Sequence, residues 1–412
     1  MSGTTLVDDA RVDGIDSGRA WVVAGAALVI NMIGFGIIYS FGSFFGAMVE
    51  EFDAGRGATA AVFSITTFLF FSFGLVSGPL YDRYGPRPLV ASSAALIATG
   101  LVLTSRVPAL WLGYLTYGVC VGVGVGLYLV PITAAVGGWF DHHRTAALGL
   151  SAAGMGLGPL IAAPMSDRLI EANGWRDSYV ILAVIAAVGI GAMSMLMKRP
   201  PSVVVFDTQA RSRWRGILGT NPFRMMFVSG LLMSLGIFVP FVFIVDYATS
   251  VGITSSRAAA LIGVLGLGSV IGRLGIGAIT VHYRTVLIVR FCLLIQATAY
   301  LIWLFADDRY WQLVVFMGLL GVGYGGFVAL VPALTAEIFG IEGLGGIFGA
   351  QFVGPALGGL IGPIVAGIVF DMTGSYQVAI VGASVTAVAA WYVLGLLDED
   401  PAAALAPTTA KT

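Results

Sequence analysis

The feature that most constrains this chain is a series of apolar stretches, each about 20 residues long, separated by short polar segments. A helix of about 20 residues crosses the roughly 30 Å hydrocarbon core of a bilayer. Only 10% of the residues are charged, and apolar side chains in contact with lipid explain so low a share. We read twelve candidate membrane spans, near residues 20–48, 57–80, 88–105, 109–138, 144–166, 177–197, 222–247, 257–281, 285–305, 310–338, 343–370 and 376–396.

The spans divide into two sets of six at the longest polar interruption, from Lys198 to Asn221. Span four contains GVGVGLYLVP (122–131) and span ten contains GYGGFVALVP (323–332), which indicates a repeat, although Gly-rich membrane helices can also resemble one another by composition alone. Repeats of six helices are one way in which secondary transporters are built. The sequence thus predicts an all-α membrane protein with an N-terminal tail (1–19), a six-helix bundle (20–197), a linker (198–221), a second six-helix bundle (222–396) and a C-terminal tail (397–412).

The distribution of positive charges predicts the orientation in the membrane. With the N-terminus inside, fourteen of the 21 Lys and Arg residues fall in cytoplasmic segments and six fall outside, and the remaining one is Arg273 within a span. Cytoplasmic loops carry an excess of Lys and Arg, so we expect both termini in the cytoplasm. The first twenty residues lack an apolar core, and we expect no cleavable signal peptide. A bacterial inner membrane is the expected location.

Several classes of function lack support in the sequence. Cys120 and Cys292 lie in separate apolar runs, and neither they nor the three histidines form a disulfide framework or a metal-ligand spacing. The net charge of −1 gives no basic field for nucleic acid. We find no nucleophile triad and no phosphate-binding loop. We therefore expect no enzymatic activity, no metal, no cofactor and no nucleic-acid partner.

The loop between spans two and three carries a recognisable signature. It reads GPLYDRYGPRP (78–88) and resembles the loop signature of the major facilitator superfamily, which implies the major facilitator fold. Its glycine would allow close helix approach, and Asp82 can accept hydrogen bonds at a neighbouring helix start or pair with an arginine. The matching segment of the second half, GIGAITVHYR (275–284), lacks the Asp-Arg pair. We assign to this conformational loop Gly78, Asp82, Arg83, Arg87 and, at the start of span five, Arg144.

Within that superfamily the chain resembles the monocarboxylate transporter-like porters. The stretches that carry the resemblance are DSGRAW (16–21), INMIGFGIIYSFGSFF (30–45), WFDHHRTAALGLSAAGMGLG (139–158) and VPFVFIVDYATSVGI (239–253). The resemblance implies a carrier of small carboxylates that works by alternating access in a lipid bilayer, with protons as a further partner. We expect it to function as a monomer.

Arg273 is the strongest candidate for a binding residue. An arginine at membrane depth costs at least about 2.5–3.5 kcal/mol and normally faces a cavity or a partner. A guanidinium in a water-filled cavity is a two-pronged receptor for a carboxylate, and the resemblance places the substrate-binding arginine of the family at this position. The alternative is that Arg273 extends to the cytoplasmic surface.

The chain departs from the family at two positions that are implicated in proton coupling. Well-known members carry an aspartate four residues before the arginine, where Ser269 stands here, and others carry a lysine on span one at the place of Tyr39. Simple proton symport is therefore in question. The remaining candidates for coupling are Asp246 and Glu337, for which a role as ordinary helix-end polar residues stays open.

Other polar groups at membrane depth are candidates for the wall of the cavity, because such groups avoid lipid. The alternative for each is a hydrogen bond between helices. The predicted substrate-binding set is Arg273, Asn31, Tyr39, Tyr324, Gln351 and Ser269.

Three functions remain open at this point. The first is a secondary active transporter of small organic anions, with monocarboxylates favoured because one buried cation suits one carboxylate. The second is an exchanger or exporter of less polar solutes, because GMGLGP (154–159) resembles a bend found in antiporters of the superfamily. The third is a transporter-like sensor, which we rank last because the tails and the linker are short.

Overall fold

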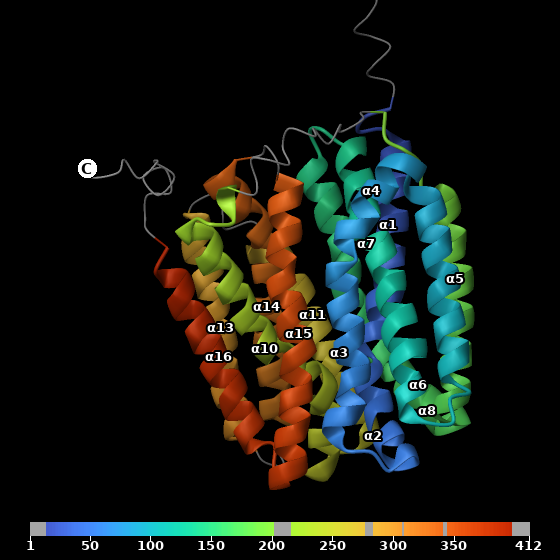
Figure 1. Cartoon of the computed structure of the whole chain (residues 1–412), viewed down its shortest axis with the longest axis vertical. Helices are drawn as coiled ribbons and strands as arrows, with labels where there is room; N and C mark the ends of the chain where they lie inside the picture. Colours follow the sequence, from blue (N-terminus) through green and yellow to red (C-terminus); the bar gives the residue numbers. More distant parts are fainter. Residues whose placement is uncertain (1–13, 202–215, 277–282, 307–308, 341–343, 398–412) are drawn as a thin grey trace, which may run out of the picture.

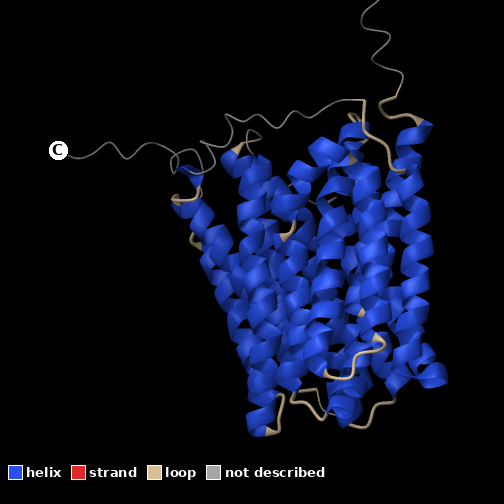
Figure 2. Cartoon of the chain, turned by 45° about the vertical axis from the view of Figure 1, so that its right-hand side comes forward, coloured by secondary structure: helices blue, strands red, loops and turns tan. Residues whose placement is uncertain are grey.

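The computed structural model describes residues 14–201, 216–276, 283–306, 309–340 and 344–397, and every regular element in these ranges is helical (Figure 2). The first half comprises α1 (Gly18–Tyr39), α2 (Phe41–Phe52), α3 (Arg56–Ser72), α4 (Gly74–Tyr84), α5 (Pro86–Thr104), α6 (Leu110–Gly113), the π-helical turn η2 (Tyr114–Val119), α7 (Cys120–Trp139) and α8 (Arg144–Leu196). The second half comprises α10 (Asn221–Ser250), α11 (Ser255–Ile271), the π-helical turn η3 (Gly272–Ile276), α13 (Thr285–Leu304), α14 (Tyr310–Phe339), α15 (Leu344–Thr373) and α16 (Gln377–Gly395).

The number of spans follows from helix lengths and two breaks. Ten helices in the described ranges are long and apolar enough to cross a membrane, and α3 with α4 forms an eleventh span that is bent by 47°. Helix α8 has 53 residues, which as a straight helix would measure about 80 Å. It breaks at Gly174, whose φ of 77° ends the helical path, so α8 contributes two spans. The structure thus confirms the predicted all-α membrane fold.

The two halves lie beside each other, with α1–α8 on one side of the bundle and α10–α16 on the other (Figure 1). Helix α1 begins and α16 ends at the same face of the molecule, as an even number of spans requires (Figure 1). We call this the termini face, and we call the other end of the bundle, at which α3 begins at Arg56, the opposite face. The halves meet where α3 packs on α15, where the first part of α8 packs on α11, and where α2 packs on α10.

Glycines allow helices within each half to approach one another at backbone distance. An added Cβ at Gly158 of α8 would lie 2.4 Å from the carbonyl oxygen of Met32 in α1. In the second half, a Cβ at Gly272 would lie 2.2 Å from the carbonyl oxygen of Val322 in α14. Small residues at helix contacts supply close packing in lipid, where apolar burial drives no association. Contacts of this kind account for part of the high glycine content of the chain.

Candidate functional site

Arg273 lies between the two halves, where it is only 7% exposed. It belongs to η3, the π-helical turn that follows α11, and such turns are frequent at functional sites. Its Nη1 donates a hydrogen bond to the carbonyl oxygen of Ala152 in α8, across the junction of the halves. Within the described ranges its Nε has no hydrogen-bond partner, and none of the ion pairs found there includes it. Arg273 is therefore a buried cation without a counter-ion in the described structure, which is costly.

Two tyrosines face Arg273, one from each half. The phenol oxygens of Tyr39 in α1 and Tyr324 in α14 lie 3.2 Å apart, and both phenols are close enough to Arg273 to interact with its charge. The Tyr39 ring also stacks on Phe241 of α10, with ring centroids 4.2 Å apart. Helices α1, α10 and α14 and the turn η3 thus bring one cation, two hydroxyl groups and an aromatic face together at the junction of the halves.

Ser269 and Tyr128 are among the residues whose buried hydroxyl groups have no hydrogen-bond partner in the described part of the chain. Ser269 lies one turn before Arg273. Tyr128 of α7 lies against α1, where its phenol oxygen fills the space that a Cβ at Gly34 would occupy. Sequence reasoning did not single out Tyr128, although a polar residue within the repeated Gly-rich segment of span four was a usable signal. Unpaired buried hydroxyls cost about 1–3 kcal/mol each, so the centre of this molecule is suited to a polar ligand.

Asn31 and Gln351 make hydrogen bonds between helices of their own halves. Asn31 of α1 donates to the carbonyl oxygen of Ser151 in α8 at 2.9 Å, one residue before the carbonyl that Arg273 uses. Gln351 of α15 accepts a hydrogen bond from Thr335 of α14 at 2.9 Å. Both residues therefore make the hydrogen bonds between helices that were the alternative to a place in the cavity wall. That Asn31 and Gln351 face a substrate cavity stays a prediction.

The two coupling candidates lie at the two ends of the bundle, away from Arg273. Asp246 is at the opposite face, where its Oδ2 lies 2.9 Å from Nε of Arg56 and accepts a hydrogen bond from Tyr376. Glu337 is near the termini face, where it accepts a hydrogen bond from Thr285. Both carboxylates have the surroundings of helix-end residues, and their part in coupling stays a prediction.

The signature loop after α4 is held by a cation. Nη2 of Arg199 donates to the carbonyl oxygens of Arg83 at 2.8 Å and Asp82 at 3.3 Å, at the C-terminal end of α4, where a positive charge is stabilising. A Cβ at Gly78 would meet no atom within 4 Å. The close helix approach expected at Gly78 is therefore not made in this structure. At the start of α8, Nε of Arg144 donates to the carbonyl oxygen of Phe140 at 3.0 Å.

The stretches 16–21 and 139–158 meet at the termini face. The carboxylate of Asp16 accepts hydrogen bonds from the backbone N–H groups of His142, at 3.0 Å, and His143, at 3.3 Å, just before α8 begins. The ring of Trp21 packs edge-on against Phe140 at 5.0 Å. The two sequence signatures form one contact that joins the start of α1 to the start of α8.

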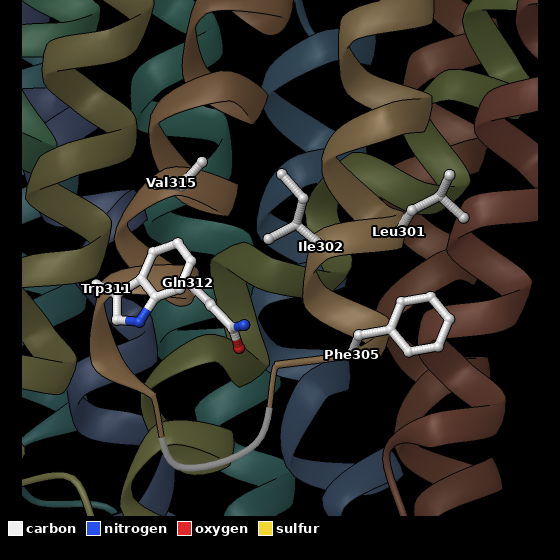
Figure 3. Close-up of a pocket in the computed structure, with 6 residues that line it drawn as sticks. All are labelled: Leu301, Ile302, Phe305, Trp311, Gln312 and Val315. Atoms are coloured by element: carbon white, nitrogen blue, oxygen red, sulfur yellow. The ribbon is translucent and has the colours of Figure 1, made fainter.

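A pocket of about 420 Å³ lies on α13 and α14, lined by Leu301, Ile302, Phe305, Trp311, Gln312 and Val315 (Figure 3). Phe305 is 73% exposed and Trp311 is 61% exposed. Large exposed apolar side chains on a spanning helix are suited to lipid contact, and none of these residues belongs to the group around Arg273.

Comparison with known proteins identifies the family of this chain. The family model of the Major Facilitator Superfamily matches residues 25–309 and 226–412. Monocarboxylate transporter 3 of Rattus norvegicus is 30% identical over 375 residues, which cover 88% of this chain and 76% of the relative. Monocarboxylate transporter 4 of Gallus gallus is 27% identical over 408 residues, which cover 96% of this chain and 86% of the relative.

A solved structure of a bacterial homologue of the human lysosomal transporter Spinster, in an inward-facing and occupied conformation, superposes with a TM-score of 0.70 at 14% identity, covering 91% of this chain and 96% of that one. This likeness concerns the fold. The all-helical architecture, the family match and the similarity to the named transporters together show that this chain belongs to the major facilitator superfamily, in its monocarboxylate transporter-like family.

Proposed function

We propose that this protein carries small monocarboxylates across a membrane by alternating access, with Arg273 as the anchor of the substrate. The observation that carries the proposal is the position of this arginine, a buried cation at the junction of the halves with no acidic partner among the described residues. A carboxylate would neutralise it through charge-assisted hydrogen bonds, which are about twice as strong as neutral ones.

The charges around the site favour a substrate with one carboxylate. A neutral solute would leave the cation of Arg273 uncompensated, and a second carboxylate would add a buried anion for which the surrounding Tyr39, Tyr324 and Phe241 offer no counter-charge. Unpaired charges in a low-dielectric site are strongly disfavoured. The aromatic rings and phenols suit a short chain with one further polar group.

The bond from Arg273 to Ala152 suggests how binding is linked to transport. Arg273 belongs to the second half and Ala152 to the first, so their hydrogen bond holds the halves together at the centre. A bound carboxylate competes with this neutral carbonyl for the guanidinium. It thereby changes the contacts between the halves at the point where they must move.

The orientation and the coupling ion belong to the same proposal. We place the termini face in the cytoplasm of a bacterial cell, with the monomer as the functional unit. Ser269 cannot titrate, so a coupled proton would be carried by Asp246 or Glu337 or would travel with the substrate. Exchange of one carboxylate for another, and export, remain alternatives to proton-linked uptake.

Uptake into proteoliposomes tests the proposal. Labelled lactate, pyruvate and acetate should accumulate, whereas a dicarboxylate and a neutral analogue of similar size should not. An inward proton gradient distinguishes the modes, because proton-linked symport drives accumulation while exchange requires carboxylate inside the vesicle. Equal transport of the neutral analogue would contradict the role assigned to the cation. A double variant with Asp246→Asn and Glu337→Gln tests the two acids. If its gradient-driven accumulation is intact, neither acid carries the proton.

A further inference from the structure

Two carboxylates occupy equivalent places in the two halves, and the function described so far uses neither. Helix α8 contains Gly158-Pro159 and α15 contains Gly362-Pro363. When these Gly-Pro pairs are aligned, an aspartate follows the proline by eight residues in both helices, Asp167 in α8 and Asp371 in α15. Each helix packs against the other half of the molecule, α8 on α11 and α15 on α3.

Asp371 binds the first turn of a helix from the other half. Its Oδ1 accepts the backbone N–H of Arg56 at 2.8 Å, and its Oδ2 accepts the backbone N–H of Gly57 at 3.0 Å. These are the first two residues of α3, whose N–H groups have no partner within the helix. A negative charge at this end of a helix is also favoured by the helix dipole. The carboxylate thus uses both oxygens to hold α3 against α15.

The backbones of α3 and α15 touch directly beside this carboxylate. A Cβ at Gly367 of α15 would lie 2.5 Å from the backbone nitrogen of Gly57, and a Cβ at Gly57 would lie 2.7 Å from Cγ1 of Ile368. Both distances are shorter than real side chains tolerate. The two glycines therefore permit a contact between the halves that a single added methyl group would force apart.

The side chain of Arg56 adds a second attachment in the same place. Its Nε lies 2.9 Å from Oδ2 of Asp246 in α10, and its guanidinium carbon lies 4.1 Å from the centre of the Phe370 ring in α15. Tyr376, just before α16, donates a hydrogen bond to the same carboxylate. Arg56 of the first half is thus enclosed by groups from three segments of the second half.

Asp167 makes the equivalent contact in the reverse direction. It is 7% exposed, and its Oδ1 accepts a hydrogen bond from the hydroxyl group of Ser255. Ser255 is the first residue of α11, in the second half. One aspartate of each half therefore reaches the first turn of a helix of the other half, and both contacts lie at the opposite face.

We propose that Asp167 and Asp371 are paired latches that hold the opposite-face end of the transport path closed, and that both must release before this end can open. The latches join the two halves and do not contact the solute. The proposal therefore rests on alternating access, which is part of the proposed function, but not on the identity of the substrate. The contact at Asp371 is the more extensive one, because Asp371 takes two backbone N–H groups and the side chain of Arg56 binds Asp246 beside it.

Distances between spin labels measured without substrate test this proposal. In a variant lacking Cys120 and Cys292, one pair of labels at Glu50 and Ser250 reports the opposite face, and a second pair at Asp141 and Arg224 reports the termini face; all four side chains are exposed. We expect Asp371→Ala to raise the population with a longer Glu50–Ser250 distance several-fold and to shorten the Asp141–Arg224 distance. Asp167→Ala should act in the same direction, and the double variant should exceed either.

Two further variants make the result decisive. Gly367→Ala keeps both carboxylates but inserts a methyl group between α3 and α15, and it should open the same face. Asp177→Ala removes an exposed acid of that face and should change neither distance. Unchanged distances in folded Asp371→Ala and Gly367→Ala proteins would overturn the latch. Carboxylate uptake is measured separately, so this outcome would leave the proposed function standing.

Discussion

The phenol oxygens of Tyr39 and Tyr324 lie 3.2 Å apart, although the two residues belong to different halves of the molecule. The bond between them, like that from Arg273 to Ala152, crosses the surface along which the halves must move. A substrate that contacts both phenols therefore contacts both halves at once. This arrangement allows a small ligand to influence the relative position of two six-helix bundles.

Removing either phenol oxygen should weaken carboxylate binding with little loss of stability. Tyr39→Phe and Tyr324→Phe keep the ring and delete one hydrogen-bonding group, and we expect a several-fold rise in the Kd of each variant. Because the hydroxyls are bonded to each other, the two effects should not add, with a coupling energy of about 0.5–1.5 kcal/mol. Isothermal titration calorimetry of the single and double variants measures this coupling.

Tyr300→Phe is the control, because it likewise removes a buried tyrosine hydroxyl, one on α13 that has no hydrogen-bond partner among the described residues. Its substitution should leave the Kd unchanged. Strictly additive losses from Tyr39→Phe and Tyr324→Phe would show that the two hydroxyls act independently in binding.

Asp16 should stabilise the folded protein in a pH-dependent way. Partial burial by itself raises the pKa of Asp16, but hydrogen bonds from the backbone of His142 and His143 outweigh it, and the pKa lies below its ordinary value. A lowered folded-state pKa contributes stability that is present above the unfolded pKa of about 3.9 and is lost as the pH falls through the folded value. Asp16→Asn should therefore lower the Tm at neutral pH, and the difference should shrink below about pH 4.

The measurement is thermal unfolding of the purified protein and of Asp16→Asn, from neutral pH to below about pH 4. Asp141→Asn serves as the control, because Asp141 is an exposed acid in the same loop. An equal loss of Tm from both substitutions would mean that general surface charge, and not the contact of Asp16 with the start of α8, stabilises this face.

Hydropathy and charge were sufficient to predict the spans, because each helix must satisfy its backbone within lipid and so leaves a long apolar run. The same argument identified Arg273, since a cation at membrane depth is conspicuous in any sequence. It did not distinguish Asn31 and Gln351, which bond within their own halves, from Tyr39 and Tyr324, which meet across the halves, because depth in the membrane does not say which neighbour a polar residue meets. Asp371 shares its spacing from a Gly-Pro pair with Asp167, but this spacing does not reveal its role, which depends on α3 and α15 being brought together by the fold.

Substitutions of the glycines in segment 154–159 should have different effects, depending on whether the glycine faces a helix of its own half or of the other half. A Cβ at Gly158 would lie 2.4 Å from the carbonyl of Met32 in the same half, whereas a Cβ at Gly156 would lie 2.7 Å from the carbonyl of Gly266 in the other half. We expect Gly158→Ala to lower the Tm, because it separates α1 from α8. Gly156→Ala should instead change the distance between the halves.

Thermal unfolding and the spin-label distances described above separate these outcomes. Gly149→Ala is the control, since a Cβ there would meet no atom within 4 Å. If Gly156→Ala and Gly158→Ala lowered the Tm equally and moved no label, the segment would serve packing alone. A role in the movement of the halves would then have to be abandoned.

The variants Arg273→Lys and Arg273→Ala should separate charge from geometry at the binding site. Lysine keeps a positive charge but lacks the planar donor pair of the guanidinium, so Arg273→Lys should bind a monocarboxylate weakly and transport it poorly. Arg273→Ala removes the cation, and we expect substrate-induced thermal stabilisation to disappear. The alanine variant should still fold, because it deletes a buried charge that has no counter-ion in the described structure.

Both readouts are needed to interpret these variants. Thermal stabilisation by substrate reports binding, and uptake into proteoliposomes reports the complete cycle. Loss of uptake with unchanged stabilisation in Arg273→Ala would place this arginine in the movement of the halves, through its bond to Ala152, and not in substrate recognition. Wild-type uptake by Arg273→Ala would reject it for both roles. The expected result is that Arg273→Ala loses binding and that Arg273→Lys loses most transport. Together these losses would mean that a carboxylate links the halves by taking the place of the Ala152 carbonyl.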